Sequence, residues 1–305
     1  MNRRETAGLL KLPLAELASM ADRTRRDEAG DALDLCNIMN AKSGLCGEDC
    51  KFCAQSSRHA TVASSYPLKS KKEIIEAARR AKAMGAYRFG IVTSGNTLTK
   101  RDLDTIAGAI AHITEKIGIE MCASLGKLSE ESLVMLKRAG LSRYHHNIET
   151  SPGFFAKIVT THTFQERVDT IRAANKAGLQ VCSGGIIGMG ETWNDRIDMA
   201  LILKELDVDS VPINILVPVK GTALEGMKPI SSADAIRTIA IFRILLKDKI
   251  IKIAAGRESI LKDFQAMAFM AGANGMLIGG YLTVRGRSIK EDRRFVEEVK
   301  EAWRK

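Results

Sequence analysis

The feature that most constrains the fold of this chain is a regular alternation of β-rich runs and amphipathic stretches from residue 31 to residue 285. Eight strands that alternate with helices over about 250 residues are typical of a (β/α)8 barrel of the TIM type. An open, doubly wound sheet remains the alternative, because the alternation alone separates the two folds weakly. The expected strands are 32–39, 87–92, 119–124, 144–148, 179–184, 210–217, 250–254 and 276–278, and the expected helices are 71–84, 102–117, 129–138, 164–176, 193–206, 232–246 and 261–270.

Both ends of the chain are predicted to be helical extensions of one domain that spans residues 1–305. Residues 1–30 form a helical lead-in, in which Pro13 suits the first turn of a helix. Residues 286–305 hold a charged amphipathic helix. No linker rich in Pro, Gly or Ser interrupts the barrel between residues 31 and 285, so we predict a single domain.

Composition limits the classes of function. With 45% hydrophobic residues the chain can build a packed core. It has no apolar stretch of the roughly 18 residues that cross a bilayer, and no apolar segment follows its charged start as in a secretory signal. We therefore expect a cytoplasmic protein with no membrane partner. The reducing conditions of the cytoplasm suit free thiols. The net charge of +10 is spread among 36 acidic residues, so we expect no nucleic-acid partner but an anionic substrate and an acidic electron donor.

Three of the six cysteines, Cys46, Cys50 and Cys53, stand at C-x3-C-x2-C spacing. Thiolates this close together can converge on one iron–sulfur cluster, and the lack of a fourth would leave one iron open. A structural zinc site is the alternative, but zinc usually closes its shell with four protein ligands. A disulfide is less favoured, because this loop holds an odd number of cysteines. The spacing therefore favours a cuboidal cluster with an open iron.

This cysteine loop resembles that of the radical S-adenosylmethionine (SAM) superfamily, with Phe52 as the aromatic residue of the motif. The wider segment 40–56 is similar to the biotin synthases, and that resemblance runs from about residue 30 to about residue 285. It implies that a [4Fe–4S] cluster binds SAM and cleaves it to a 5′-deoxyadenosyl radical, which removes hydrogen from dethiobiotin. Sulfur from an auxiliary iron–sulfur cluster then completes biotin. The resemblance also implies a homodimer and a flavodoxin- or ferredoxin-type electron donor.

The other three cysteines, Cys36, Cys122 and Cys182, lie on the first, third and fifth predicted strands. Inward side chains from alternate strands of such a barrel share one layer, so three thiols on odd strands can meet in the interior. Lys252, on the seventh strand, would be costly there without an anionic partner. Buried apolar cysteines and a lysine on the outer face remain the simpler alternatives.

In the family's familiar form, three cysteines from the second, third and fifth strands and an arginine from the seventh hold a [2Fe–2S] cluster. Cys122 and Cys182 match two of these ligands, whereas Gly90 and Lys252 replace the other two. Only three thiols are present, with Cys36 as the new one. We therefore hypothesise a four-iron auxiliary cluster with one non-cysteine site and Lys252 beside it. Loss of the second cluster is the contrary interpretation.

The resemblance also assigns residues to the nucleotide. The run 184–191 is similar to the superfamily's G-x-I-x-G-x-x-E motif, which would place Ile186 beside the adenine and let Glu191 support the turn. Asn147 and Glu149, expected on the fourth strand, would meet the ribose hydroxyls, although the family usually has Asp in place of Glu149. The neighbouring pair His145 and His146 is most simply interpreted as buried neutral histidines.

Further residues are assigned to the two ligands by the same resemblance. Arg167 would bind the methionyl carboxylate, since a guanidinium binds carboxylates in bidentate fashion, and Ser94 would lie near the methionyl amine. Asn214, together with Asn147, would bind the ureido ring, because an amide offers both a donor and an acceptor. Thr283 would meet the substrate carboxylate, but Val284 stands where the family often has a second threonine.

Two other interpretations are kept open. One is a related radical SAM enzyme, similar to the hydrogenase-cofactor maturase or to the pyrrolysine-pathway mutase. The other is a non-catalytic iron–sulfur protein, which would not explain the set of nucleotide-binding residues at the strand ends.

Overall fold

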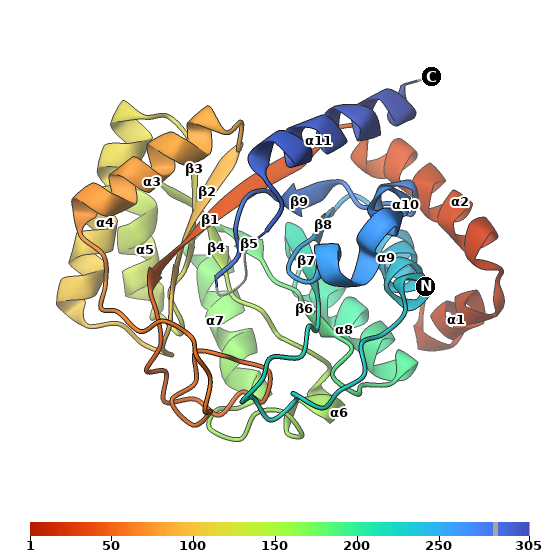
Figure 1. The fold of residues 1–305 in the computed structure, drawn as a ribbon, viewed down its shortest axis with the longest axis horizontal. Coiled ribbons are helices and arrows are strands. Elements are labelled where there is room, and N and C mark those ends of the chain that lie inside the picture. The colour runs from red at the N-terminus through yellow and green to blue at the C-terminus, as the bar shows by residue number, and fades with distance from the viewer. Residues whose placement is uncertain (283–285, 305) are drawn as a thin grey trace.

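The computed structural model describes residues 1–282 and 286–304, and it contains a closed parallel barrel (Figure 1). The sheet order is β5-β4-β3-β2-β1-β9-β8-β7-β6, and a further pairing of β5 with β7 closes it. Because β5 and β6 are successive parts of the fifth barrel strand, the barrel has eight positions and the open-sheet alternative is wrong. The strands are β1 (Asp34–Lys42), β2 (Arg88–Thr93), β3 (Glu120–Ser124), β4 (Leu141–His145), β5 (Gln180–Cys182), β6 (Gly185–Ile187), β7 (Ser210–Ile215), β8 (Ile250–Ile253) and β9 (Gly275–Leu277).

Helices cover the outside of the barrel, as expected for this fold. In the first of them the apolar face of Ile74, Ala78 and Ala81 is fully buried, and a capping box between Ser70 and Glu73 begins the helix. The helices of the barrel are α3 (Lys71–Ala83), α4 (Lys100–Lys116), α5 (Glu130–Arg138), α6 (Pro152–Phe155), α7 (Phe164–Lys176), α8 (Trp193–Glu205), α9 (Ser232–Leu246) and α10 (Gln265–Met270).

The fourth and fifth strands differ from the prediction. β4 begins at Leu141 and ends at His145, three residues before the predicted end. The first residues of β4 include polar ones that do not indicate a buried strand, yet one of them, Arg143, points into the barrel and is buried. The fifth strand is broken after Cys182, where Gly184 lies so close to the Pro212 carbonyl that a Cβ atom would be 2.0 Å from its oxygen. Because β4 ends at His145, the residues that follow His145 belong to the loop after β4.

The last helix predicted for the barrel, 261–270, is shorter than expected. Residues 261–264 form tight, irregular turns, and regular helix begins only at Gln265. Lys262 has a φ of 48°, which is outside the helical range and interrupts the helix at this point.

The two ends of the chain pack together on the barrel (Figure 1). The lead-in contains α2 (Leu14–Thr24) and a short helix that the prediction missed, α1 (Arg3–Gly8). The C-terminal helix is α11 (Ile289–Trp303). The guanidinium of Arg25, just after α2, lies 3.9 Å from the ring centroid of Trp303, so the lead-in and the last helix are in direct contact.

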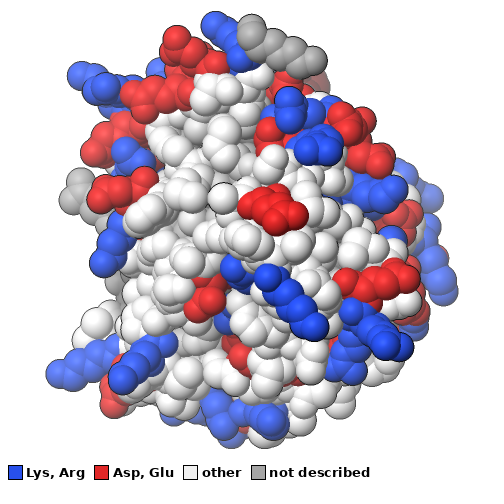
Figure 2. All heavy atoms as spheres, turned by 90° about the vertical axis from the view of Figure 1, so that its right-hand side faces the viewer, with Lys and Arg blue, Asp and Glu red and all other residues white. Residues whose placement is uncertain are grey.

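The surface does not gather its positive charge on the face that carries α1 and α2. Figure 2 shows basic and acidic side chains interspersed there. Within the described ranges, none of the helices has the length and apolar character needed to cross a membrane.

Candidate active site

A cavity of about 460 Å³ opens at the carboxyl ends of the strands, where barrels of this type bind their ligands. Both sets of thiols line it, together with nearly all other residues singled out from the sequence. Glu191 is not among the lining residues, and Thr283 lies outside the described residues. The predicted residues that line the cavity are Cys36, Cys46, Cys50, Phe52, Cys53, Ser94, Cys122, Asn147, Glu149, Arg167, Cys182, Ile186, Asn214 and Lys252.

The cysteine loop follows β1 and presents its three thiols to the cavity. The Cys50 side chain is buried, whereas Cys46 and Cys53 are partly exposed, and burial raises the pKa of the Cys50 and Cys53 thiols. Backbone bonds fix the loop: Cys46 N–H donates to the Gln55 carbonyl at 3.1 Å and Cys53 N–H to the Cys50 carbonyl at 2.9 Å. These three soft donors in one cavity fit an iron–sulfur cluster.

Zinc was the alternative for this loop. Within the part of the chain that the structure describes, no three His, Cys, Asp or Glu side chains are arranged to hold one metal ion. The thiolates of a cuboidal cluster each bind a different iron, so they need not converge as the ligands of a single ion do.

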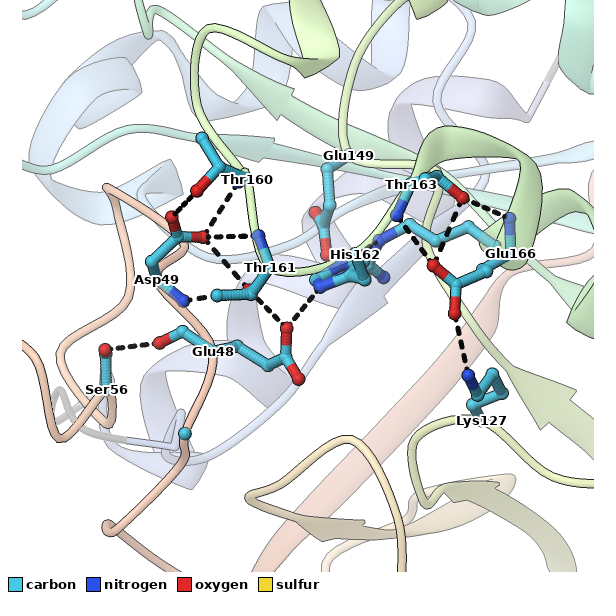
Figure 3. Close-up of polar contacts among 12 residues, drawn as sticks. Glu48, Asp49, Ser56, Lys127, Glu149, Thr160, Thr161, His162, Thr163 and Glu166 are labelled. Carbon is cyan, nitrogen blue, oxygen red and sulfur yellow. Dashed lines mark hydrogen bonds and ion pairs between the residues drawn. The ribbon is translucent and has the colours of Figure 1, made fainter.

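The cysteine loop is docked onto the loop between α6 and α7 (Figure 3). The Asp49 carboxylate accepts hydrogen bonds from the backbone N–H groups of Thr160, at 2.9 Å, and Thr161, at 3.2 Å. Glu48 receives further bonds from the side chains of Thr161 and His162. The sequence interpretation missed all of these residues, although Glu48 and Asp49 stand between two predicted ligands.

Arg167, on α7, reaches the cavity from the outer layer. Its Nη1 donates to the Asn147 carbonyl at 2.9 Å and lies 3.6 Å from Glu149 Oε1. Its Nε donates to His162 Nε2 at 3.1 Å. Only 13% of this side chain is exposed, so Arg167 is not a surface residue.

The glycine-rich turn after the fifth strand is held by Glu191, as the sequence predicted. Its carboxylate accepts from the N–H groups of Gly188, at 2.8 Å, and Met189, at 2.7 Å, and it pairs with Arg196 at 2.7 Å. Ile186 precedes this turn and lines the cavity. The backbone of the turn is therefore fixed before any ligand arrives.

Glu149 lies beyond β4, not on it as predicted, and has a strained backbone with a φ of 67°. Its carbonyl accepts from Ile186 N–H at 2.9 Å, which joins the loop to the fifth strand. Gly185 permits this contact, because a Cβ atom there would lie 2.3 Å from the Glu149 carbonyl oxygen. Strain of this kind often marks functional sites.

The two asparagines are also held by backbone groups. Asn147, which likewise lies past the end of β4, accepts from Gly184 N–H at 3.1 Å. Asn214 accepts from Ala255 N–H at 3.2 Å and donates to the Gly185 carbonyl at 3.2 Å. Ser94 donates to the Gly44 carbonyl at 2.7 Å, so it ties the second strand to the cysteine loop.

The other three thiols meet deeper in the barrel, as their strand positions predicted. Cys36, Cys122 and Cys182 are buried in β1, β3 and β5. Strand register places Arg88 opposite Cys36 and Arg143 opposite Cys122, so even-numbered strands add two cations to this layer. Three thiols beside fixed positive charge form a donor set that fits an anionic iron–sulfur cluster.

Lys252 points into the barrel, and the outer-face alternative is wrong. Its Nζ lies 2.8 Å from Asp34 Oδ1, while Asp34 Oδ2 lies 3.2 Å from Arg88 Nε and 3.4 Å from Arg143 Nη1. Burial would raise the pKa of Asp34, but the three cations outweigh it and lower that pKa to about 2. Asp34 was missed from the sequence, although it stands two residues before Cys36 and so shares its face of the strand.

A histidine joins this layer from β4. His145 Nδ1 lies 3.3 Å from the sulfur of Cys182, its register partner. Burial opposes ionisation, but His145, Lys252 and Arg143 lower the pKa of Cys182 to about 6. Buried neutral histidines were expected for the pair: His146 is buried, and burial together with Arg167 lowers its pKa, whereas His145 is only half-buried.

Comparison with known proteins agrees with this geometry. Residues 42–203 match the Radical SAM superfamily, and residues 212–300 match the Biotin and Thiamin Synthesis associated domain. A biotin synthase of Thermotoga neapolitana is 56% identical over 270 residues, which cover 88% of this chain and 96% of the relative. The chain belongs to the biotin synthase family. A second member, the biotin synthase of Pelotomaculum thermopropionicum, is 47% identical over 293 residues, which cover 96% of this chain and 91% of that one.

Solved structures similar to this family member confirm its fold. Methylornithine synthase superposes with a TM-score of 0.84 at 22% identity, over 97% of this chain and 92% of that one. A maturase of the [FeFe]-hydrogenase superposes with a TM-score of 0.83 at 18% identity, over 98% of this chain and 71% of that one. At such identities the likeness concerns the barrel alone.

Proposed function

We propose that this radical SAM enzyme of the biotin synthase family converts dethiobiotin to biotin by inserting sulfur. The observation that carries the proposal is a single cavity lined by two sets of three thiols, one in the loop after β1 and one inside the barrel. A non-catalytic iron–sulfur protein would need neither two sets of thiols nor the polar residues around them.

Cys46, Cys50 and Cys53 would hold a [4Fe–4S] cluster, which with bound SAM supplies the 5′-deoxyadenosyl radical that removes hydrogen from unactivated carbon. The chain itself binds and orients. Arg167 takes the methionyl carboxylate, and Ser94 lies near the amine. The ribose meets Asn147 and Glu149. Phe52 and Ile186 supply apolar contacts, with Ile186 beside the adenine.

Asn147 and Asn214 would bind the ureido ring of dethiobiotin, because each amide offers a donor and an acceptor. Both amides already bond to backbone groups, so their orientation is fixed. Fixed polar groups bind a ligand without a large cost in side-chain ordering. Thr283 is proposed to meet the substrate carboxylate.

Cys36, Cys122 and Cys182 would hold the auxiliary cluster that supplies sulfur. Three thiols favour a four-iron type with one non-cysteine site over a [2Fe–2S] cluster. Lys252 is paired with Asp34 at 2.8 Å, which favours a place for Lys252 beside the cluster, not on an iron.

The net charge of +10 supports an acidic electron donor of the flavodoxin or ferredoxin type. A cytoplasmic location and a homodimer are proposed with it, since both are implied by the resemblance to the family.

The function is tested with anaerobically reconstituted enzyme, a one-electron reductant, SAM and dethiobiotin. We expect biotin and 5′-deoxyadenosine, and we expect 5′-deoxyadenosine to depend on dethiobiotin. The Cys46/Cys50/Cys53→Ala protein is the control and should form neither. Cleavage of SAM without biotin would point to a maturase-like or mutase-like enzyme, and no cleavage at all to a non-catalytic protein.

The same control protein tests the auxiliary cluster, because it keeps only the deeper thiols. We expect about four irons and a matching amount of acid-labile sulfide per chain. About two irons would indicate the smaller cluster with a fourth ligand of another kind. No iron would remove the proposed sulfur source.

A further inference from the structure

His162 lies in the loop between α6 and α7 and joins two parts of the proposed SAM site. Its Nε2 is 3.1 Å from Arg167 Nε. Its Nδ1 is 2.5 Å from Glu48 Oε2 in the cysteine loop, a contact drawn in Figure 3. Only 5% of the side chain is exposed. The ring also packs against the edge of Phe155, with centroids 5.7 Å apart.

These two contacts require one tautomer of the imidazole. Arg167 Nε–H can only donate, so His162 Nε2 must be the unprotonated acceptor. The ring proton is then on Nδ1, from which it is donated to the Glu48 carboxylate. Glu48 thus keeps His162 in the tautomer that can accept the hydrogen bond from Arg167. The partner of one ring nitrogen sets the protonation of the other nitrogen.

The contacts of Arg167 leave a defined part of its guanidinium for a ligand. Nε is held by His162, and Nη1 donates to the Asn147 carbonyl. Among the described residues, no hydrogen bond uses Nη2. The guanidinium is therefore held at two points, Nη2 is left for a ligand, and Arg167 lines the cavity.

We propose that His162 is a positioning residue, which orients Arg167 toward the carboxylate of SAM and is itself set by Glu48. This inference rests on the proposed function, in which Arg167 binds that carboxylate. Through the chain Glu48–His162–Arg167, the orientation of the Arg167 guanidinium depends on the cysteine loop. The loop that carries the thiols therefore also orients the group that binds the amino-acid part of SAM.

Two substitutions separate the halves of this link. His162→Gln places an amide oxygen near the position of Nε2, where it accepts from Arg167. His162→Asn places an amide N–H near the position of Nδ1, where it donates to Glu48 but does not reach Arg167. His162→Phe keeps the ring contact with Phe155 and removes both bonds. Lys127→Met is the matched control, because it removes an exposed ion pair with Glu166, one residue from Arg167.

The probes are S-adenosylhomocysteine, which carries the amino-acid part, and 5′-methylthioadenosine, which lacks it. Their dissociation constants are measured on reconstituted enzyme of known iron content, and the thermal midpoint is measured on the same samples. We expect the dissociation constant of S-adenosylhomocysteine to rise about tenfold in His162→Asn and His162→Phe, equivalent to about 1.4 kcal/mol. His162→Gln and Lys127→Met should stay within roughly threefold, and 5′-methylthioadenosine should bind all variants alike.

Equal weakening of both probes, or an Asn variant that binds S-adenosylhomocysteine like the original enzyme, would overturn the inference. So would a Gln variant that is as weak as the Asn variant, because keeping the hydrogen bond to Arg167 would then not keep the affinity. If the original enzyme binds the two probes equally, the proposed role of Arg167 fails, and that result is distinct from failure of the His162 link.

Discussion

Asp34 balances three cations inside the barrel, and it is the carboxylate on which Lys252, Arg88 and Arg143 converge. Its pKa is lowered from 3.8 to about 2. The stabilisation from a lowered carboxyl pKa is complete above the ordinary pKa and is lost as the pH falls through the lowered one. At neutral pH, Asp34 therefore contributes fully to the stability of the folded chain.

We expect Asp34→Asn to lower the free energy of unfolding by about 3–5 kcal/mol, because it leaves buried cations without their counter-charge. The change is measured by denaturant unfolding of the reconstituted enzyme at neutral pH. Glu298→Gln is the control, since Glu298 pairs with Arg294 at 2.8 Å and both side chains are mostly exposed, and such pairs contribute about 1 kcal/mol or less. Equal losses in the two variants would contradict the central role of Asp34.

At the scale of elements, the cysteine loop depends on another loop for its shape. The carboxylate of Asp49 binds two successive backbone N–H groups, those of Thr160 and Thr161. These bonds join segments that are more than 100 residues apart in the sequence. The loop between α6 and α7 therefore supports the one that presents the thiols.

Asp49→Ala should loosen the cysteine loop without unfolding the barrel. We expect cluster iron to be lost to a chelator roughly five times faster, corresponding to about 1 kcal/mol of lost docking energy. The midpoint of thermal unfolding should change little, because Asp49 is not part of the core. Chelation is followed by the loss of cluster absorbance, and Glu76→Ala, in an exposed pair on α3, is the control. An unchanged rate would show that the loop keeps its shape without this contact.

The sequence predicts an element well when residues close in the sequence stabilise it, and poorly when the stabilising contacts come from distant parts of the chain. Helices α7 and α9 were placed correctly, because their apolar spacing and their caps, Thr163 and Ser231, are local signals. β4 was placed three residues late, because Arg143 is buried with partners that are distant in the sequence, Gln180 and Asp34, the latter 109 residues away. Likewise, spacing and strand parity predicted that the six cysteines form two sets, and all six line the cavity, whereas His162 and Asp34 act through contacts that leave no local pattern.

At the scale of the whole molecule, the two matched family segments do not form two structural units. Residues 42–203 and 212–300 each contribute strands to one barrel. β1, most of which precedes both segments, pairs with β2 on one side and with β9 on the other. Closure at the far side is between β5 and β7. Each segment therefore leaves unpaired strand edges without the other, and we propose that the chain folds as one domain.

The two tryptophans of the chain test this proposal, because Trp193 lies in the first family segment and Trp303 lies just past the end of the second, on a helix that is mostly inside it. Trp193 is on α8, and Trp303 ends α11, where it packs against Phe269 and Arg25. We expect denaturant curves from tryptophan fluorescence and from far-ultraviolet circular dichroism to coincide in Trp193→Phe, which reports on Trp303, and in Trp303→Phe, which reports on Trp193. Comparison within each variant removes the effect of the substitution on stability. A fluorescence transition of Trp303 that precedes the loss of secondary structure would mean that the C-terminal segment unfolds by itself, and the barrel would then not be a single cooperative unit.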